Sequence, residues 1–374
     1  MTRKLGRDPA RRCLPLAEWP APDRAIWEVA LRLGDIFEPG GERVRHARGS
    51  NRAVEQGHGR WLGWLQHTGH WNAVAEPADL ITPEHVGAYL AAMGCNSTAT
   101  RLRRLGELSI MARLAAPDRD WRWIHQIASR VRQRHKPTRD KRPRLVGADD
   151  LVTLGHSLMR EAAGTGLSPW RRPLLFRDGL AIALLAQRPL RRRNFAELRL
   201  GKHLQKRGNA WWMLIEGDET KTGVTIEMPW PADLTTALER YIAQWRPLLL
   251  DSRTTHARHL PGAGTALWVS AWGTAINPQA LYDLVTRHTR EAFGKAVNPH
   301  LFRDCVATSI AIEDPVHIGI ASQILGHRSS STTERYYNQA RSIEAAHGWQ
   351  ATLDKLRQGG ELGHGPSPTR RTTP

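Results

Sequence analysis

The sequence is poor in cysteine, with only Cys13, Cys95 and Cys305 among its 374 residues. These residues lie far apart and form no C-x-x-C pair, so neither a disulfide framework nor a zinc site is expected. No apolar run approaches the roughly 18 residues that a membrane-spanning helix needs. The basic residues 1–12 precede no apolar run, so no signal peptide is expected. These absences predict a soluble, cytoplasmic protein without a membrane partner.

Signals for cofactor binding are also lacking. No glycine-rich phosphate-binding loop stands out, and the 17 histidines show no zinc-ligand spacing. The adjacent acids Asp149 and Asp150 are more typical of a helix start than of a two-metal nuclease site. The sequence therefore predicts a protein that uses no metal and no nucleotide cofactor.

Acidic residues are few relative to basic ones, with 36 Asp and Glu against 54 Lys and Arg. The formal net charge is +18, and the sequence pI is near 10.8. This imbalance favours a polyanionic partner, because each phosphate contact releases counterions and so contributes affinity. Membrane surfaces are polyanionic too, but the balance favours nucleic acid.

A chain of this length is long enough for two ordinary domains. Residues 136–144 (KPTRDKRPR) hold five basic residues, one acid and two prolines, which is typical of a linker. The chain then divides into a basic flexible arm (1–22), a helical domain (23–135), a basic linker (136–146), a second domain (147–358) and a disordered tail (359–374).

Two helices of the first domain are clear in the sequence. Thr82-Pro83 is typical of an N-cap followed by proline in the first helical turn, and Val86 and Tyr89 then share one face. Residues 99–114 combine an apolar face with a cationic face that includes Arg101, Arg103, Arg104 and Arg113. That cationic face is either solvated or lies against phosphates.

The second domain mixes helices with one hairpin. Leu151 lies near the start of a helix, and Pro173–Gln187 is apolar enough for a buried helix. Residues Trp211–Glu216 and Val224–Met228 are predicted to form a hairpin around the turn 217–223. Further helices are expected after Asn277, at Pro299, up to Gly326, and from Ser331 to Gln358. The expected fold is mainly α with a small antiparallel β-sheet.

Six residues of the second domain suit chemistry at a phosphodiester. Arginine forks neutralise non-bridging oxygens, a cationic amine protonates a leaving oxygen, and a phenol attacks phosphorus. His300 and Arg303 are three apart on an expected helix and so share a face. The six residues are Arg191, Lys221, His300, Arg303, His327 and Tyr336.

These residues lie in five motifs, and their order resembles the catalytic domain of the tyrosine site-specific recombinases, the phage integrase family. Each motif occurs by chance in many proteins, but five in order, with nine residues from His327 to Tyr336, are specific. The resemblance covers roughly residues 145–357, while residues 23–134 resemble the family's core-binding domain in position and character. The motifs are Leu190-Arg191, Lys221-Thr222-Gly223, His300-x-x-Arg303, Leu325-Gly326-His327 and Thr332-Thr333-x-x-Tyr336.

The resemblance implies a role for each residue. Tyr336 would be the nucleophile that forms a 3′-phosphotyrosine and frees a 5′-hydroxyl. Arg191 and Arg303 would hold the scissile phosphate and stabilise the transition state. Lys221 would protonate the leaving 5′-oxygen.

The two histidines have implied roles as well. His300 would assist proton transfer from the tyrosine, and His327 would hydrogen-bond a phosphate oxygen. The phosphotyrosine conserves the bond energy, so no ATP is needed.

The resemblance also implies an assembly and partners. The two domains would form a C-shaped clamp on duplex DNA that carries specific recombination sites. Four copies would assemble on two sites, with the last helix, roughly Ala340–Arg357, docked on a neighbouring protomer; packing within its own chain is the alternative. Accessory DNA-bending proteins are possible partners, and the reaction would integrate or excise a mobile element.

One position departs from the family pattern. Three residues after the first arginine, where the family usually has Glu or Asp, this chain has Asn194. Glu197 lies one turn further along and could substitute as the support of Arg191. Arg192 and Arg193 are alternatives for the catalytic arginine, although Pro-Leu-Arg aligns Arg191 with the family's Gly-Leu-Arg. In this register, Asn194→Asp is expected to be tolerated or beneficial.

Two other functions remain open on the sequence. A type IB topoisomerase-like enzyme would relax DNA by the same chemistry without exchanging strands. A DNA-binding accessory protein with a degenerate site is the other alternative, and Asn194 is the only feature in its favour.

Overall fold

The computed structural model describes residues 12–72, 74–134, 141–251 and 261–313. The chain divides into two compact units, Met1–Asp140 and Lys141–Pro374. We call them the N-terminal and the C-terminal unit. The boundary falls inside the segment predicted as a linker. Within the described residues, no helix is long and apolar enough to cross a membrane.

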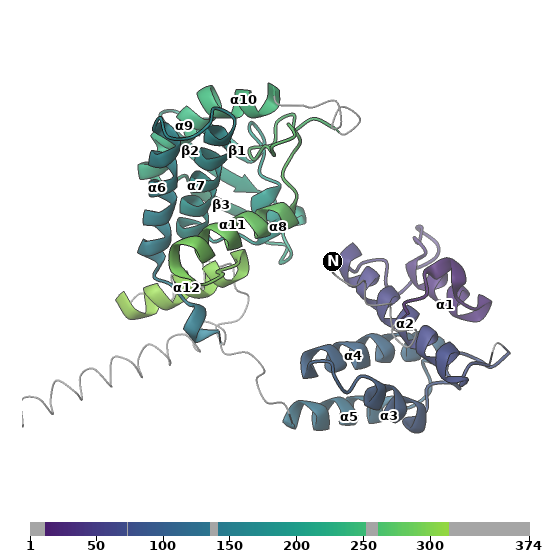
Figure 1. The fold of residues 1–374 in the computed structure, drawn as a ribbon. Helices are drawn as coiled ribbons and strands as arrows, with labels where there is room; N and C mark the ends of the chain where they lie inside the picture. Colours follow the sequence, from purple (N-terminus) through teal and green to yellow (C-terminus); the bar gives the residue numbers. More distant parts are fainter. Residues whose placement is uncertain (1–11, 73, 135–140, 252–260, 314–374) are drawn as a thin grey trace, which may run out of the picture. The chain divides into compact units, whose positions relative to one another are not determined.

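The N-terminal unit is helical, as the sequence predicted (Figure 1). Thr82 caps the third helix by accepting from the backbone N–H of His85 at 3.2 Å, and Val86 and Tyr89 are buried, which confirms that helix. The helices are α1 (Ala21–Leu31), α2 (Arg48–Thr68), α3 (Pro83–Ala92), α4 (Thr98–Ala115) and α5 (Arg122–Gln133).

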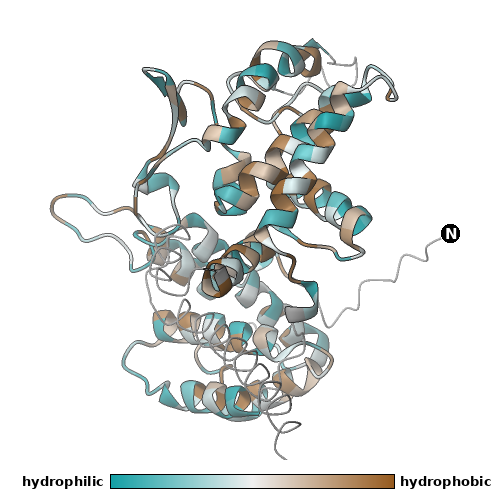
Figure 2. Cartoon of the chain, turned by 90° about the vertical axis from the view of Figure 1, so that its left-hand side faces the viewer, coloured by the Kyte–Doolittle hydropathy of each residue, from teal (hydrophilic) through white to brown (hydrophobic). Residues whose placement is uncertain are grey.

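Tryptophans fill the centre of the N-terminal unit. Trp27, Trp61 and Trp64 are all buried, and the rings of Trp61 and Trp64 stack with their centroids 5.2 Å apart. Figure 2 shows hydrophilic and hydrophobic segments alternating along the helices, as expected where each helix buries one face.

Residues 12–22, expected to belong to a flexible arm, instead pack on this core. Leu14 and Trp19 are buried, and the backbone N–H of Leu14 donates to the carbonyl of Gly59 at 2.9 Å. A Cβ on Gly59 would lie 2.3 Å from the carbonyl oxygen of Leu14, so only glycine permits this approach. The arm prediction was wrong here because buried apolar side chains outweigh the prolines around them.

The cationic face of α4 has a structural role that neither sequence-based reading included. Arg104 and Arg103 pair with Glu107 at 2.6 and 2.9 Å, and Arg101 donates to the carbonyl of Met93 at 3.2 Å. Burial raises the pKa of Glu107, an effect that its arginine partners oppose. The two ion pairs lie within α4, and the contact of Arg101 joins α4 to the end of α3.

The C-terminal unit combines helices with a small sheet (Figure 1), which confirms the predicted fold class. Its helices are α6 (Ala148–Ala163), α7 (Arg171–Gln187), α8 (Arg192–Ala196), α9 (Thr235–Arg240), α10 (Arg246–Asp251), α11 (Pro278–Phe293) and α12 (Pro299–Glu313). Its strands are β1 (Leu204–Arg207), β2 (Ala210–Ile215) and β3 (Ile226–Pro229).

Within the described residues the sheet is antiparallel in the order β1-β2-β3. Leu204 pairs with Met213, and Met213 pairs with Met228 on its other side. The predicted hairpin is confirmed as β2 and β3, whereas β1 was not predicted. The β2–β3 connection carries the candidate residue Lys221.

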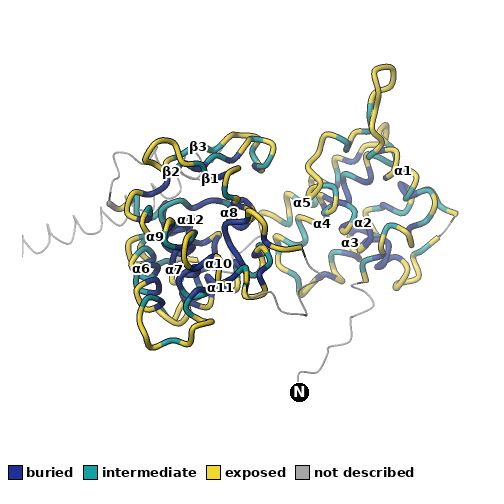
Figure 3. The backbone as a smooth tube through the Cα atoms, turned by 90° about the horizontal axis from the view of Figure 1, so that it is seen from above, coloured by how far each residue is buried: buried dark blue, intermediate teal, exposed yellow. Residues whose placement is uncertain are grey.

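The core of the C-terminal unit is built around α7. Its side chains from Leu180 to Leu185 are all buried, as the deep blue of α7 in Figure 3 shows. A Cβ on Gly155 of α6 would lie 2.6 Å from the carbonyl oxygen of Gly179 on α7, so these two helices pack closely at paired glycines. The predicted helix at Pro173–Gln187 is thus confirmed, and it is buried.

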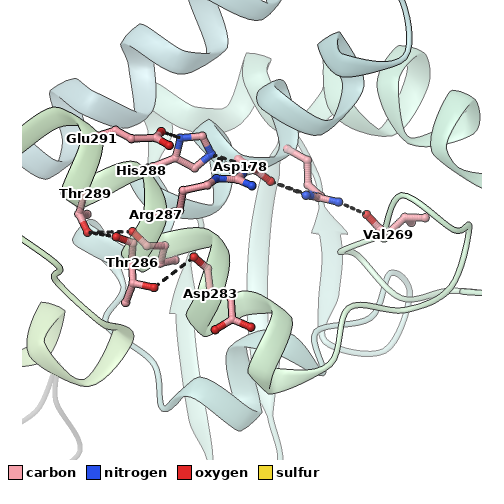
Figure 4. Close-up of polar contacts among 10 residues, drawn as sticks. Asp178, Val269, Asp283, Thr286, Arg287, His288, Thr289 and Glu291 are labelled. Carbon is pink, nitrogen blue, oxygen red and sulfur yellow. Dashed lines mark hydrogen bonds and ion pairs between the residues drawn. The ribbon is translucent and has the colours of Figure 1, made fainter. Parts of the chain in front are cut away.

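A buried polar network lies beside this core (Figure 4). The carboxylate of Asp178 on α7 is bonded to Arg177 Nε at 2.9 Å and to His288 Nε2 of α11 at 2.9 Å. Arg177 in turn donates to the carbonyl of Val269 at 2.6 Å. The network joins α7 to α11 and to the segment before α11.

Candidate active site

Helix α12 positions His300 and Arg303. Its start is fixed by Asn298, whose side-chain oxygen accepts from the backbone N–H groups of His300 and Leu301, both at 3.0 Å. This cap satisfies N–H groups that have no partner within the helix. His300 is exposed at the helix start, and Arg303 follows one turn later.

Arg303 is directed into the C-terminal unit. It is 7% exposed, and its Nη1 donates to the backbone carbonyl of Pro189. Pro189 is two residues before Arg191, so this hydrogen bond joins the start of α12 to the segment of the first arginine motif. The neighbouring carboxylate of Asp304 pairs with Lys141 at 3.0 Å.

Arg191 is the N-cap residue of α8 and is half-buried. The next two arginines are exposed and bind elsewhere: Arg192 lies over the ring of Tyr282 at 5.8 Å, and Arg193 pairs with Glu197 at 3.0 Å. Glu197, considered above as a substitute support for Arg191, is thus an ion-pair partner of Arg193. Arg191 is thus less exposed than its two neighbours, and its assignment as the catalytic arginine stays a prediction.

Lys221 lies in a tightly closed turn between β2 and β3. The Thr220 hydroxyl is buried and accepts from the backbone N–H of Val224 at 3.1 Å. Gly223 has φ +69°, and a Cβ on Gly217 would lie 2.7 Å from the carbonyl oxygen of Gly223. Lys221 is exposed at the tip of this turn.

Asn194 of α8 connects the arginine segment to this turn. It is 8% exposed, and its Nδ2 donates to the backbone carbonyl of Glu219 at 2.9 Å. The Glu219 side chain is held separately, by Lys202 Nζ at 2.7 Å and by His203 Nε2 at 3.1 Å. The contacts of Glu219, Lys202 and His203 were not predicted, because polar residues in short turns carry no periodic signal in the sequence.

The surroundings of His300 favour its neutral form. Desolvation of the ring lowers its pKa below the usual 6.5, and the positive charges of Lys141 and Arg303 act in the same direction. The carboxylate of Asp304 opposes them but does not outweigh them. A neutral imidazole can accept a proton, which the role implied for His300 requires.

Two hydrogen bonds therefore join three of the five motif segments. One runs from Arg303 to Pro189, and the other runs from Asn194 to Glu219. His327 and Tyr336 lie outside the described residues. So do the end of the helix expected up to Gly326 and the whole helix expected from Ser331 to Gln358.

Comparison with known proteins gives a family assignment. The model of the phage integrase family matches residues 157–342, a range that contains all six candidate residues. Over 100 residues the chain is 34% identical to tyrosine recombinase XerC of Bifidobacterium longum subsp. infantis and 33% identical to XerC of Bifidobacterium longum strain DJO10A. Each alignment spans 27% of this chain and only 27% of the relative.

Solved structures share the fold over more of the chain. A pre-cleavage complex of the XerH site-specific recombinase with its difH substrate is 17% identical, with a TM-score of 0.51 over 80% of each chain. A post-cleavage complex of XerH with a palindromic difH substrate is 15% identical, with a TM-score of 0.53 over 93% of this chain and 98% of that one. With the family match and this shared fold, the chain belongs to the phage integrase family, the tyrosine recombinases.

Proposed function

We propose that the protein is a site-specific recombinase that cleaves and rejoins duplex DNA through a 3′-phosphotyrosyl intermediate. The observation that carries the proposal is the pair of hydrogen bonds that joins the segments of Arg191, Lys221 and Arg303. Segments that carry two arginines and a lysine and are joined in this way suit a phosphodiester, because these side chains can neutralise the phosphate and protonate its leaving group.

The proposed reaction is a transesterification. The phenolic oxygen of Tyr336 attacks phosphorus, the bond from phosphorus to the 5′-oxygen breaks, and Lys221 donates a proton to that oxygen. Arg191 and Arg303 hold the non-bridging oxygens, and His327 donates a hydrogen bond to one of them. Attack by the freed 5′-hydroxyl of a partner strand then reverses the step and releases Tyr336.

His300 accepts the phenolic proton in this scheme. Its pKa, lowered by desolvation, supports that role, because the ring is neutral at physiological pH. Proton balance follows: one proton passes from Tyr336 to His300, and another passes from Lys221 to the leaving group. Religation returns both protons.

Specific DNA sites and a tetramer on two of them complete the proposal. The net charge of +18 supports a duplex partner. We propose that the reaction integrates or excises a mobile element, and that accessory DNA-bending proteins assist it.

The chemistry can be tested on a nicked suicide duplex. Its sequence is taken from inverted repeats in the DNA that flanks the gene. Cleavage beside the nick releases a short 5′ fragment and prevents religation, so a covalent adduct should accumulate, even in a chelator. Tyr336→Phe removes one oxygen with little change of shape, so DNA binding should persist while the adduct disappears. In the helix that the sequence predicts here, adjacent residues would point about 100° apart, so the matched control Tyr337→Phe should still form adduct.

The other outcomes of this assay distinguish the proposed recombinase from its alternatives. Absence of an adduct from the unaltered protein would overturn the proposal in favour of a DNA-binding accessory protein. An adduct with relaxation of supercoiled DNA but no strand exchange would indicate a topoisomerase-like enzyme. An adduct mapped to Tyr337 would move the nucleophile but keep the chemistry.

A further inference from the structure

We propose that Asn194 is a positioning residue for Lys221, and that it must be an amide because it holds the Lys221 turn by donating a hydrogen bond. The inference rests on the proposed function, in which Lys221 protonates the leaving oxygen. It concerns the one position at which this chain departs from the acidic residue usual in the family.

The Lys221 turn is closed by hydrogen bonds among its own residues. Thr220 Oγ1 lies 3.0 Å from the carbonyl oxygens of Gly217 and Val224, and it accepts from the backbone N–H of Val224. The backbone N–H of Thr220 also donates to the carbonyl of Gly217 at 3.1 Å. These bonds hold residues 217–224 in one compact turn, so an anchor on this turn also restrains the position of Lys221.

Asn194 provides such an anchor from α8. A backbone carbonyl oxygen can only accept a hydrogen bond, so the group that faces Glu219 O at 2.9 Å must be the amide nitrogen of Asn194. Because α8 directly follows Arg191, the same contact fixes the distance between the Lys221 turn and the segment of the first arginine. Asn194 is 8% exposed, so water has little access to replace the contact.

A second anchor holds the other side of Glu219. Its carboxylate binds Lys202 and His203, and the hydrogen bond from Lys202 helps to keep the pKa of Glu219 below its usual value, so the group stays charged. The backbone carbonyl and the side chain of Glu219 are thus bound from different segments. Loss of the Asn194 contact should let the turn shift while the sheet beneath it stays folded.

A carboxylate at position 194 would face the Glu219 carbonyl with a second acceptor. Two acceptors repel each other, and the part-buried carbonyl would lose its donor. From this contact we expect Asn194→Asp to be harmful, in contrast to the expectation from the sequence that it would be tolerated or beneficial. The amide of Asn194, which replaces the family's acidic residue, supplies the donor that the Glu219 carbonyl requires.

The test compares two leaving groups on the nicked suicide duplex. An ordinary 5′-oxygen needs a proton to depart, whereas a 5′-bridging sulfur does not. Asn194→Asp and Asn194→Ala should each slow adduct formation by about tenfold or more on the oxygen substrate. On the sulfur substrate both should return to within about threefold of the unaltered protein, as should Lys221→Ala. Asn209→Asp, the same change at an exposed asparagine, is the matched control and should be normal on both substrates.

Failure of this inference differs from failure of the proposed function. Equal deficits of the Asn194 variants on both substrates, or no deficit at all, would overturn the positioning role while adduct formation by the unaltered protein upholds the recombinase. Equal deficits of Lys221→Ala would remove the acid role and the positioning role together. Melting temperatures identify a variant that does not fold. Should Asn194→Asp be such a variant, Asn194→Ala decides on the same criterion.

Discussion

His300 combines an exposed position at the start of α12 with a lowered pKa. Its ring is neutral above pH 6.5, so the rate of adduct formation should not change between about pH 7 and 8. As the pH falls below 6.5, through the lowered pKa, the ring gains a proton and can no longer accept one, so the rate should fall. His300→Gln cannot titrate, and we expect a rate reduced by about 100-fold or more, without this acidic decline.

The measurement is a series of single-turnover rates on the nicked duplex, with DNA binding followed by gel shift over the same pH range. Loss of DNA binding in parallel with the rate would assign the decline to binding instead. The same acidic decline in His300→Gln would assign it to another group.

The sequence identified residues that carry chemistry but not their hydrogen-bond partners. The order of the motifs and the spacing within them selected Arg303 and Lys221, because a motif can be recognised from positions that are close in the sequence. Arg303 donates to the Pro189 carbonyl, and Asn194 donates to the Glu219 carbonyl. Each donor and its acceptor are far apart in the sequence and meet only in the folded chain. Asn194 was therefore recognised as unusual, while its function as a donor was not.

Among the elements, those with a local signal were predicted, including the hairpin of β2 and β3, whereas β1 was not. The caps at Thr82 and Asn277 satisfy N–H groups of their own helices, and each lies where the sequence predicted it. Strand β1 has the sequence LQKR, whose basic residues give no alternating pattern. It is a strand because β2 beside it offers backbone partners.

The network around Asp178 is the element contact with the clearest energetic consequence. Burial by itself would raise the pKa of Asp178, but the charge of Arg177 and the hydrogen bond of His288 outweigh it and lower the pKa. Because the folded pKa lies below the usual 3.8, the resulting stabilisation is complete above pH 3.8 and is lost as the pH falls through the folded value.

Asp178→Asn should therefore reduce the free energy of unfolding by about 3–5 kcal/mol at neutral pH, because it leaves Arg177 buried without its carboxylate. Its stability should also depend less on pH below about 4 than that of the unaltered protein. Urea unfolding followed by tryptophan fluorescence measures both. Asp283→Asn, at an exposed position of α11, is the control and should change stability by no more than about 0.5 kcal/mol. A loss equally small in Asp178→Asn would contradict the structural role of the network.

For the whole chain, the division into two units falls where the sequence changes composition, between Asp140 and Lys141. The second half of the predicted linker nevertheless packs on the C-terminal unit. Lys141 pairs with Asp304 at 3.0 Å, and Arg144 donates to the carbonyl of Ala296. Composition could not reveal this, because a basic segment looks the same whether its charges bind carboxylates, carbonyls or phosphates.

The last segment of the chain, 340–374, lies outside the described residues, and the sequence predicts that its helix docks on a neighbouring protomer. Removal of these residues tests that prediction. Binding to a single site should persist, because most basic residues remain and each phosphate contact is a small share of the affinity. Cooperative assembly on paired sites should weaken, because docking between protomers supplies part of its free energy.

Gel shifts on duplexes with one site and with two sites separate these effects, and the melting temperature of the free protein is the control. A segment that docks on another protomer contributes nothing to the isolated chain, so that temperature should not change. A segment that packs on its own chain buries apolar surface there, so its removal should lower the melting temperature. A lower melting temperature with unchanged cooperativity would therefore contradict docking between protomers and assign the helix to its own unit.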